Sequence, residues 1–300
     1  MFDPKLSLSK AERREKREVR RAKQRAANAA RAVKMHIERL RMKRDGASSA
    51  PSHVQGNPGA FVGCSGWFYW HWRGGLYPAD LAPSSWFGQY TATFRTVELN
   101  ASFYSWPTVA TVQGWIRQAG RRRFVYTVKV CELITHVKRF VGTKNLIRDF
   151  GVIADLLGPR MGCFLFQLPP SFRYTKARLG RILSQLDPKR RNVVEFRHRS
   201  WWREDVYRAF RKAGIIFCSC SAPRLPEELV ETAEDIYIRF HGTKRWYRHN
   251  YSSSELAVWV EKIVSSKACR VWAYFNNDRG GYAVKNAQLF TRMMQASKKT

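Results

Sequence analysis

The sequence predicts a closed eight-stranded α/β barrel preceded by a basic N-terminal helix. Eight short apolar runs follow residue 59, helix-length segments separate most of them, and about 240 residues contain all eight units, as in (β/α)8 barrels of the triosephosphate-isomerase (TIM) type. An open doubly wound sheet is the alternative. Its glycine-rich dinucleotide fingerprint is absent after the first run, where Gly63 to Gly66 lead into an aromatic stretch. The barrel is therefore favoured.

The first fifty residues are predicted to form a basic helical extension. The segment 9–44 lacks proline and glycine, and Ser9 with Glu12 has the form of a capping box, so a helix is expected to begin there. A narrow apolar seam with alternating spacings of three and four is expected to pack weakly on another surface: Val19, Ala22, Ala26, Ala29, Val33, His36 and Leu40. The Ser-, Pro- and Gly-rich stretch 47–59 predicts a flexible linker. The predicted organisation is an extension with its linker over 1–58 and a barrel domain over 59–300.

The apolar runs give the predicted strands, and the segments of helical period between them give the helices. The strands are expected at 61–65, 96–100, 124–129, 162–167, 192–197, 215–220, 236–241 and 271–276. The helices include 83–94, 109–119, 201–213, 252–263 and 283–294. The sixth connection, 223–233, is expected to be mostly irregular.

Polar residues recur at the carboxyl ends of these strands. Alternate residues of a strand face opposite sides, and the last inward residues of barrel strands line the site of barrel enzymes. The alternation points the following side chains into the barrel mouth, with Ser65 from the first strand: Glu98, Asn100, Thr127, Lys129, Gln167, Glu195, Arg197, Arg239, His241 and Asn276. Mutual neutralisation of buried charges is the purely structural explanation. Apolar residues would fill this space at least as stably, so the sequence favours a functional site.

The segments at these strand ends also resemble a known family. They are 63–67 (GCSGW), 97–104 (VELNASFY), 134–136 (ITH), 166–170 (FQLPP), 194–198 (VEFRH), 238–242 (IRFHG) and 275–277 (FNN). Together, over about residues 60–295, they are similar to the YecE-like family, domain of unknown function 72. The resemblance implies a TIM-type barrel and no particular reaction, although members are likened on structural grounds to barrel endonucleases acting on damaged DNA. This chain departs from the family in its basic extension and in Ser221, where many members carry aspartate.

The predicted mouth combines cations, carboxylates and imidazoles, which suits acid–base chemistry on an anion. Glu98 or Glu195 is the candidate base, His241 the acid or proton shuttle, and Lys129 a further catalytic candidate. The candidate substrate-binding residues are Arg197 and Arg239 as anion holders, Asn100, Gln167 and Asn276 as orienting groups, and the nearby His136 and His198. Histidines and glutamates on different strands could converge on a metal. No H-x-x-H or H-E-x-x-H motif supports one, so no metal ligand is assigned and the cofactor stays open.

Aromatic residues and cysteines supply two further expectations. The rings that follow the first, second and seventh strands either stack on a ligand or form a small core of their own: Trp67, Tyr69, Trp70, Trp72, Tyr104, Trp106, Trp246, Tyr247 and Tyr251. The six scattered cysteines lack metal-type spacing and are predicted to be mostly free and buried.

The net charge of +31 predicts a nucleic acid or another polyanion as partner, in addition to a small anionic substrate. Residues 1–50 carry 16 Lys and Arg against 6 Asp and Glu, a net of +10, which leaves +21 for the body. No apolar run approaches the length of a membrane span, and the glutamates near the N-terminus argue against a transit peptide. A cytoplasmic location is predicted, with organellar import as the alternative.

Two functional hypotheses from different classes follow. The first is an enzyme acting on a phosphate-bearing or otherwise anionic substrate, with nucleic-acid-derived molecules as one candidate class. It would be either a hydrolase of the phosphodiesterase type or an acid–base isomerase or lyase. The second is a non-catalytic nucleic-acid-binding or ribonucleoprotein-binding protein that uses its basic tail and surface.

Overall fold

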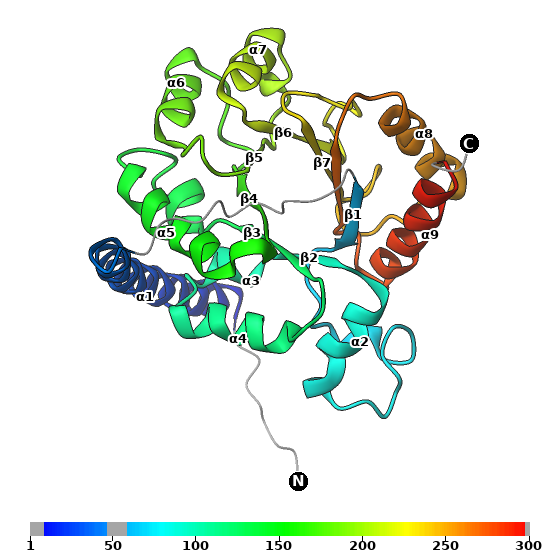
Figure 1. Ribbon diagram of the computed structural model, residues 1–300, viewed down its shortest axis with the longest axis horizontal. Helices are drawn as coiled ribbons and strands as arrows, with labels where there is room; N and C mark the ends of the chain where they lie inside the picture. Colours follow the sequence, from blue (N-terminus) through cyan, green and yellow to red (C-terminus); the bar gives the residue numbers. More distant parts are fainter. Residues whose placement is uncertain (1–8, 47–58, 298–300) are drawn as a thin grey trace.

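A computed structural model describes residues 9–46 and 59–297 and contains eight parallel strands in a nearly closed barrel with helices around it (Figure 1). The strands are β1 Gly59–Cys64, β2 Thr96–Leu99, β3 Val125–Lys129, β4 Met161–Gln167, β5 Asn192–Glu195, β6 Ile216–Ser221, β7 Asp235–Phe240 and β8 Arg270–Phe275. Each strand begins and ends within two residues of its predicted position. The predicted barrel and N-terminal helix are therefore confirmed.

The helices alternate with the strands, with one exception. They are α1 Lys10–Arg44, α2 Trp86–Thr93, α3 Ala101–Tyr104, α4 Val109–Ala119, α5 Lys144–Leu157, α6 Lys176–Gln185, α7 Glu204–Ala213, α8 Ser253–Val264 and α9 Tyr282–Ala296. As predicted, the connection between β6 and β7 has no helix in the described chain. Two short helical turns, η3 Leu133–Val137 and η5 Arg199–Trp201, follow β3 and β5. No described helix combines the length and the apolar composition needed to cross a membrane.

The strand order is β1-β8-β7-β6-β5-β4-β3-β2, and no backbone pairing joins β1 to β2 among the described residues. A side chain from α2 closes this seam. The Tyr90 hydroxyl accepts the backbone N–H of Cys64 at 2.9 Å and donates to the carbonyl of Thr96 at 3.0 Å. Gly63 lies so near the Thr96 carbonyl that a Cβ would collide with it, so glycine allows the two strands to approach. The Asn100 amide also crosses the seam to the Ser65 carbonyl, at 3.2 Å.

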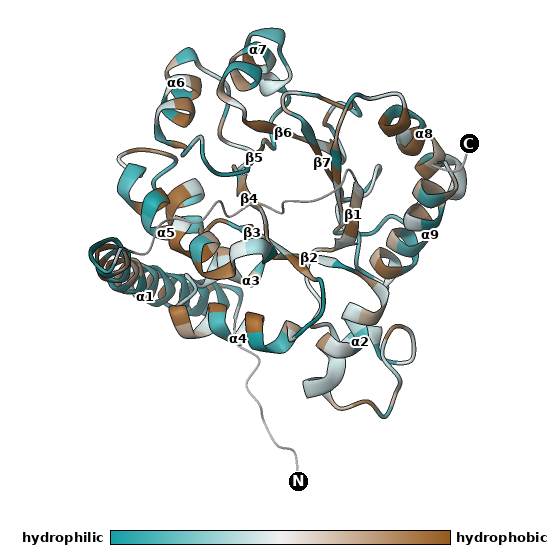
Figure 2. Cartoon of the chain, viewed as in Figure 1, coloured by the Kyte–Doolittle hydropathy of each residue, from teal (hydrophilic) through white to brown (hydrophobic). Residues whose placement is uncertain are grey.

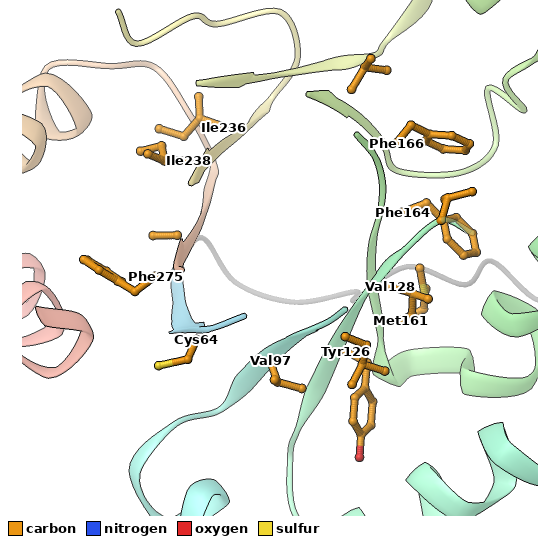
Figure 3. Close-up of a cluster of buried hydrophobic side chains, with 14 of the residues drawn as sticks. Cys64, Val97, Tyr126, Val128, Met161, Phe164, Phe166, Ile236, Ile238 and Phe275 are labelled. Atoms are coloured by element: carbon orange, nitrogen blue, oxygen red, sulfur yellow. The ribbon is translucent and has the colours of Figure 1, made fainter. Parts of the chain in front are cut away.

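Two apolar layers hold the barrel together. Between the strands and the helices lie outward residues such as Val97, Val128 and Ile238, which Figure 3 shows among other apolar side chains of this layer. Inside the barrel a second cluster includes Tyr237 and Trp272, and the Trp272 ring stacks on Phe61 at 4.3 Å between centroids. Figure 2 shows the hydrophobic colour on the strands and the hydrophilic colour along most of α1.

Helix α1 lies against α5 at the outside of the barrel, as Figure 1 shows, and it begins at the predicted capping box. The prediction for its packing face was wrong. Asn28, Ala32 and Met35 are buried, whereas Val19 and Val33 of the expected seam are 64% and 61% exposed. The face that packs is determined in part by a polar residue, because the Asn28 amide hydrogen-bonds to the backbone at Tyr104 and Trp106. The sequence periodicity counted only apolar residues and therefore did not include Asn28. The predicted linker and the first eight residues lie outside the described chain.

Candidate functional site

A network of buried charges crosses the barrel near the carboxyl ends of β2, β5 and β7. Its centre is the fully buried Arg239 of β7, whose Nη2 donates to Glu98 at 2.5 Å and whose Nη1 donates to Glu195 at 2.6 Å. Glu98 also accepts the Tyr237 hydroxyl at 2.5 Å. Each carboxylate therefore has a charged partner, which buried ions need because an unpaired one costs several kcal/mol.

Arg197 and His241 extend this network toward the mouth. The Nε of Arg197 contacts Glu195, and its Nη2 lies 3.1 Å from His241 Nε2. The guanidinium carbon sits 4.4 Å from the centroid of the Trp246 ring, a cation–π contact. His241 Nε2 is also 3.2 Å from Glu195, and its Nδ1 is 3.3 Å from the Asn276 amide nitrogen. These contacts fix the orientation of both the imidazole and the guanidinium.

Lys129, at the end of β3, is the cation with the least compensation. Lys129 is 8% exposed, and its Nζ lies 4.2 Å from the centroid of the Phe103 ring. Across residues 9–46 and 59–297, the ammonium forms no hydrogen bond or ion pair with a protein acceptor. Burial, and then the neighbouring guanidinium of Arg239, lowers the pKa of Lys129 to about 7. This amine can therefore accept or release a proton near neutral pH.

Three other titratable groups, Glu195, His241 and His136, are each held in one protonation state. Burial alone would raise the pKa of Glu195, but Arg197 and Arg239 outweigh it and hold that pKa well below its usual range. Burial and the same two guanidinium groups lower the pKa of His241 well below its usual value. Burial, followed by the charge of Lys129, lowers the pKa of His136 to about 4. Near neutral pH, Glu195 is thus ionised and both histidines are uncharged.

A pocket of about 680 Å³ opens at the mouth, above the network. Its barrel side comprises Phe103, Tyr104, Lys129, Glu132, His136, Gln167 and Tyr247, and its other side consists of Arg17, Arg20, Arg21, Gln24 and Arg25 of α1. Its charged residues are five cations and one carboxylate, so it attracts anions. Its volume lies in the range of pockets that hold one small ligand.

Most of the predicted site residues are brought together. The contacts described above join Glu98, Glu195, Arg197, Arg239, His241 and Asn276, while Lys129, His136 and Gln167 line the pocket. Asn100 lies at the seam between β1 and β2. His198 is placed elsewhere, since its Nδ1 accepts the Ser200 N–H at 3.2 Å and caps the turn η5. His198 directly follows the inward Arg197, so alternation gave no reason for it to face the mouth.

The sequence prediction missed several groups. Tyr237 lies two residues before Arg239 on the same strand, so alternation could have placed it in the network. Glu132 lines the pocket from the turn after β3, and no pattern indicated this. Tyr247 was already expected among the aromatic residues after the seventh strand, but its φ of +66°, an unusual conformation for a non-glycine residue that is often found at functional sites, was not.

The aromatic residues near the openings divide into buried and exposed rings. Trp72, Trp106 and Tyr251 are buried in the core cluster that also contains Val97 and Val128. Tyr104 and Tyr247 are 62% and 42% exposed and line the pocket, where their rings are available to a ligand.

Three buried residues offer ligand atoms of the kind that metals bind: Glu195, Cys220 and His241, with the atoms within 4.8 Å of one another. Glu195 and His241 already contact guanidinium groups, which oppose a cation electrostatically. This donor set does not fit a metal ion well. Among the cysteines, all six are free thiols and five are buried, as predicted. The Sγ atoms of Cys218 and Cys220 lie 3.9 Å apart.

Comparison with known proteins gives consistent relationships. Residues 61–300 match the family model described as "Protein of unknown function DUF72". The UPF0759 protein YunF of Bacillus subtilis is 26% identical over 277 residues, which cover 78% of this chain and 94% of that protein. A DUF72 family protein of Thermotoga maritima superposes with a TM-score of 0.72 at 30% identity, covering 79% of this chain and 99% of that one. A DUF72 family protein of Enterococcus faecalis, at 19% identity and a TM-score of 0.67, supports the fold alone.

Proposed function

The chain belongs to the DUF72 family, and we propose that it is an enzyme performing acid–base chemistry on a phosphate-bearing or otherwise anionic substrate at the carboxyl ends of its barrel strands. One observation carries the proposal. Lys129 has no anionic partner of its own in the described chain, and it lies between the paired charges and the open pocket. A buried charge without a structural partner is the kind of group that active sites retain.

Charge balance supports an anionic substrate. Arg197 and Arg239 neutralise Glu98 and Glu195, so a protonated Lys129 is the surplus positive charge of the network. In the free protein this surplus is disfavoured by burial, which lowers the pKa of Lys129 to about 7. An anion bound at the mouth would supply the missing negative charge and raise that pKa. Substrate binding and proton uptake by Lys129 would therefore favour each other.

This arrangement supports a different division of roles from the one the sequence suggested. Lys129 is the better general base, because two guanidinium groups keep Glu195 ionised and weakly basic. Arg197, at the outer edge of the network, is the anion holder. Arg239 is a positioning residue, since both of its terminal nitrogens already bind carboxylates. Gln167, His136 and Asn276 would contact the substrate through neutral hydrogen bonds.

Two reaction classes are compatible with a neutral amine at this position. In a hydrolase, Lys129 would take the proton of the attacking water; in an isomerase or lyase, it would take a proton from a carbon of the substrate. In both, the resulting ammonium would lie beside the substrate anion, which stabilises it.

The test is turnover of a panel of phosphomonoesters and phosphodiesters by the full-length protein and by Lys129→Met. We expect the wild-type kcat/KM, which reports the substrate-free protein, to rise with pH through about 7, and the variant to lose about 10²- to 10⁴-fold in kcat/KM. Lys138→Met, an exposed lysine beyond the turn η3, is the matched control and should retain wild-type turnover. Turnover that is unchanged in Lys129→Met would overturn the proposal.

A second candidate function is nucleic-acid binding without catalysis. It is favoured by the exposed arginines on α1, four of which lie beside the mouth. In that case, deletion of residues 1–50 would weaken polyanion binding and flatten its salt dependence, whereas Lys129→Met would change no measured activity.

We also infer a reducing compartment such as the cytoplasm. All six cysteines are free, and burial raises the pKa of the Cys64 and Cys163 thiols well above its usual value, which keeps these groups unreactive.

A further inference from the structure

Helix α1 forms a wall of the pocket that contains Lys129. Arg17, Arg20, Arg21 and Arg25 line this pocket together with barrel residues, although they precede β1 by more than thirty residues. None of these four arginines forms an ion pair with a carboxylate of the described chain. Their positive charge is therefore available to a ligand.

The helix is held in place by specific contacts. The buried Asn28 amide donates to the Tyr104 carbonyl at 3.0 Å and accepts the Trp106 N–H at 2.9 Å. Arg31 donates to the Ser105 hydroxyl at 2.6 Å, and Arg39 pairs with Asp149 of α5 at 2.7 Å. The arginine row is thus attached at a defined position beside the mouth.

We propose that α1 is a part of the active site and that the substrate is single-stranded nucleic acid, with its phosphates along the α1 arginines and one nucleotide inserted toward Lys129. This inference rests on the proposed function and names its substrate class. It also assigns the basic extension a place in the site, which the family match over residues 61–300 does not cover.

The spacing of the arginines fits a strand of phosphates. Arg17, Arg21 and Arg25 recur every four residues, so they share one helix face at intervals of about 6 Å along the axis. A row of guanidinium groups binds successive phosphates without selecting a base sequence.

The barrel side of the pocket supplies what a base needs. Tyr104 and Tyr247 line the pocket with exposed rings, and aromatic rings stack bases of single strands with little sequence preference. A volume of about 680 Å³ holds one nucleotide. A single strand can insert one directly, whereas a duplex must first unpair and unstack it, which costs free energy. The combination of arginines, exposed tyrosines and a small pocket thus favours a single strand.

The test is fluorescence anisotropy with a fluorescein-labelled single-stranded oligo(dT) 12-mer, across a salt series, using the full-length protein. Replacement of Arg17, Arg20, Arg21 and Arg25 by Gln should weaken binding at least tenfold and reduce the slope of log K against log salt by about 3. The matched control replaces Lys10, Lys16, Lys23 and Lys34 by Gln on the same helix, away from the pocket. This control removes the same number of positive charges, and its affinity for oligo(dT) should remain at least threefold higher than that of the arginine variant.

Two further variants test the position of α1 and the stacking ring without changing the charge of the protein. Asn28→Ala with Met35→Ala loosens α1 while keeping every charge, and it should weaken oligo(dT) binding about tenfold. Tyr104→Leu removes a stacking ring from an exposed position and should weaken it about 5- to 100-fold. A blunt duplex of the same length should bind more weakly than the single strand.

The outcomes distinguish this inference from the proposed function. Equal binding by the arginine and lysine variants, or equal binding of duplex and single strand, overturns the inference. If phosphoester turnover still depends on Lys129 in that case, the proposed function stands alone. Turnover independent of Lys129 overturns the proposed function, and the assignment of a substrate falls with it.

Discussion

Both ends of the barrel contain a buried cluster of charges, and the two clusters differ in how completely they are paired. At the amino end, Asp235 accepts from Trp272 Nε1 at 2.9 Å and contacts the Nε atoms of Arg191 at 2.6 Å and Arg270 at 2.8 Å. At the carboxyl end, the network around Arg239 leaves Lys129 without a partner among the described residues.

The difference indicates which cluster is structural. The amino-end cluster ties β5, β7 and β8 together, and its arginine side chains are partly open to water. The amino end of such a barrel usually contributes to stability and not to catalysis. The carboxyl-end cluster is more deeply buried, and its Lys129 forms no ion pair in the described chain, which has no structural benefit. A buried charged group without an ion-pair partner is thus a better indicator of function here than a buried ion pair.

The largest effect on stability is expected from Glu195→Gln. This change removes the negative charge shared by Arg197 and Arg239 and leaves two buried guanidinium groups undercompensated. Urea unfolding should show a loss of about 3–5 kcal/mol in the free energy of unfolding. Glu261→Gln, at an exposed position of α8, should change it by less than about 0.5 kcal/mol. A loss below about 1 kcal/mol would mean that water enters the network.

Asp235→Asn should have a smaller effect, about 1–3 kcal/mol in the same measurement, because its arginine partners can turn to solvent. Phosphoester turnover and oligo(dT) affinity should remain at wild-type values. A change in either would show that the amino end also contributes to the site, and the comparison between the two ends would fail.

The next effect concerns pH. The pKa of Lys129 is lowered to about 7 in the folded chain. Between pH 7 and the ordinary pKa of a lysine, the unfolded chain therefore binds more protons at this residue than the folded chain does. Stability should therefore rise with pH in this range, by about 1 kcal/mol per unit between pH 7 and 8.5. The measurement is the slope of the unfolding free energy against pH, compared between the wild type and Lys129→Met. The difference between the two slopes removes the contributions of other groups. Identical slopes would show that Lys129 has an ordinary pKa.

The smallest effect is expected at His136. Burial and the charge of Lys129 lower its pKa to about 4, so the ring should stay uncharged from pH 7 down to about 5. NMR titration of its ring protons should give a midpoint near 4. A His136 midpoint near 6.5 would indicate that the mouth is wetter than the contacts suggest.

The strand-end residues could be predicted because a period of two determines the face of each side chain. That reasoning placed Glu98, Glu195 and Arg239 together inside the barrel, as the contacts confirm. It could not determine how far along the barrel axis each side chain lies, or which side chains pair with one another. Arg239 consequently appeared to be a ligand-binding group, although both carboxylates occupy it.

The placement of α1 could not be predicted for another reason. Its helix and capping box follow from local sequence, but its packing depends on Asn28 meeting free backbone groups of a loop distant in sequence. Such a match is a tertiary property. The contribution of Arg17 and Arg21 to the mouth pocket was invisible for the same reason.

The strand order has a consequence for biosynthesis. Strand β1 has its backbone ladder with β8, about 210 residues later in the chain, and within the described part of the protein its hydrogen bonds toward β2 run through the Tyr90 side chain. During translation β1 is therefore the first strand to emerge, and its main-chain groups must wait for β8 to be synthesised before they find their partners. Such a distant pairing slows folding and leaves the nascent strand exposed to wrong partners in the meantime. The short length of β1, Gly59–Cys64, with two glycines, limits that risk.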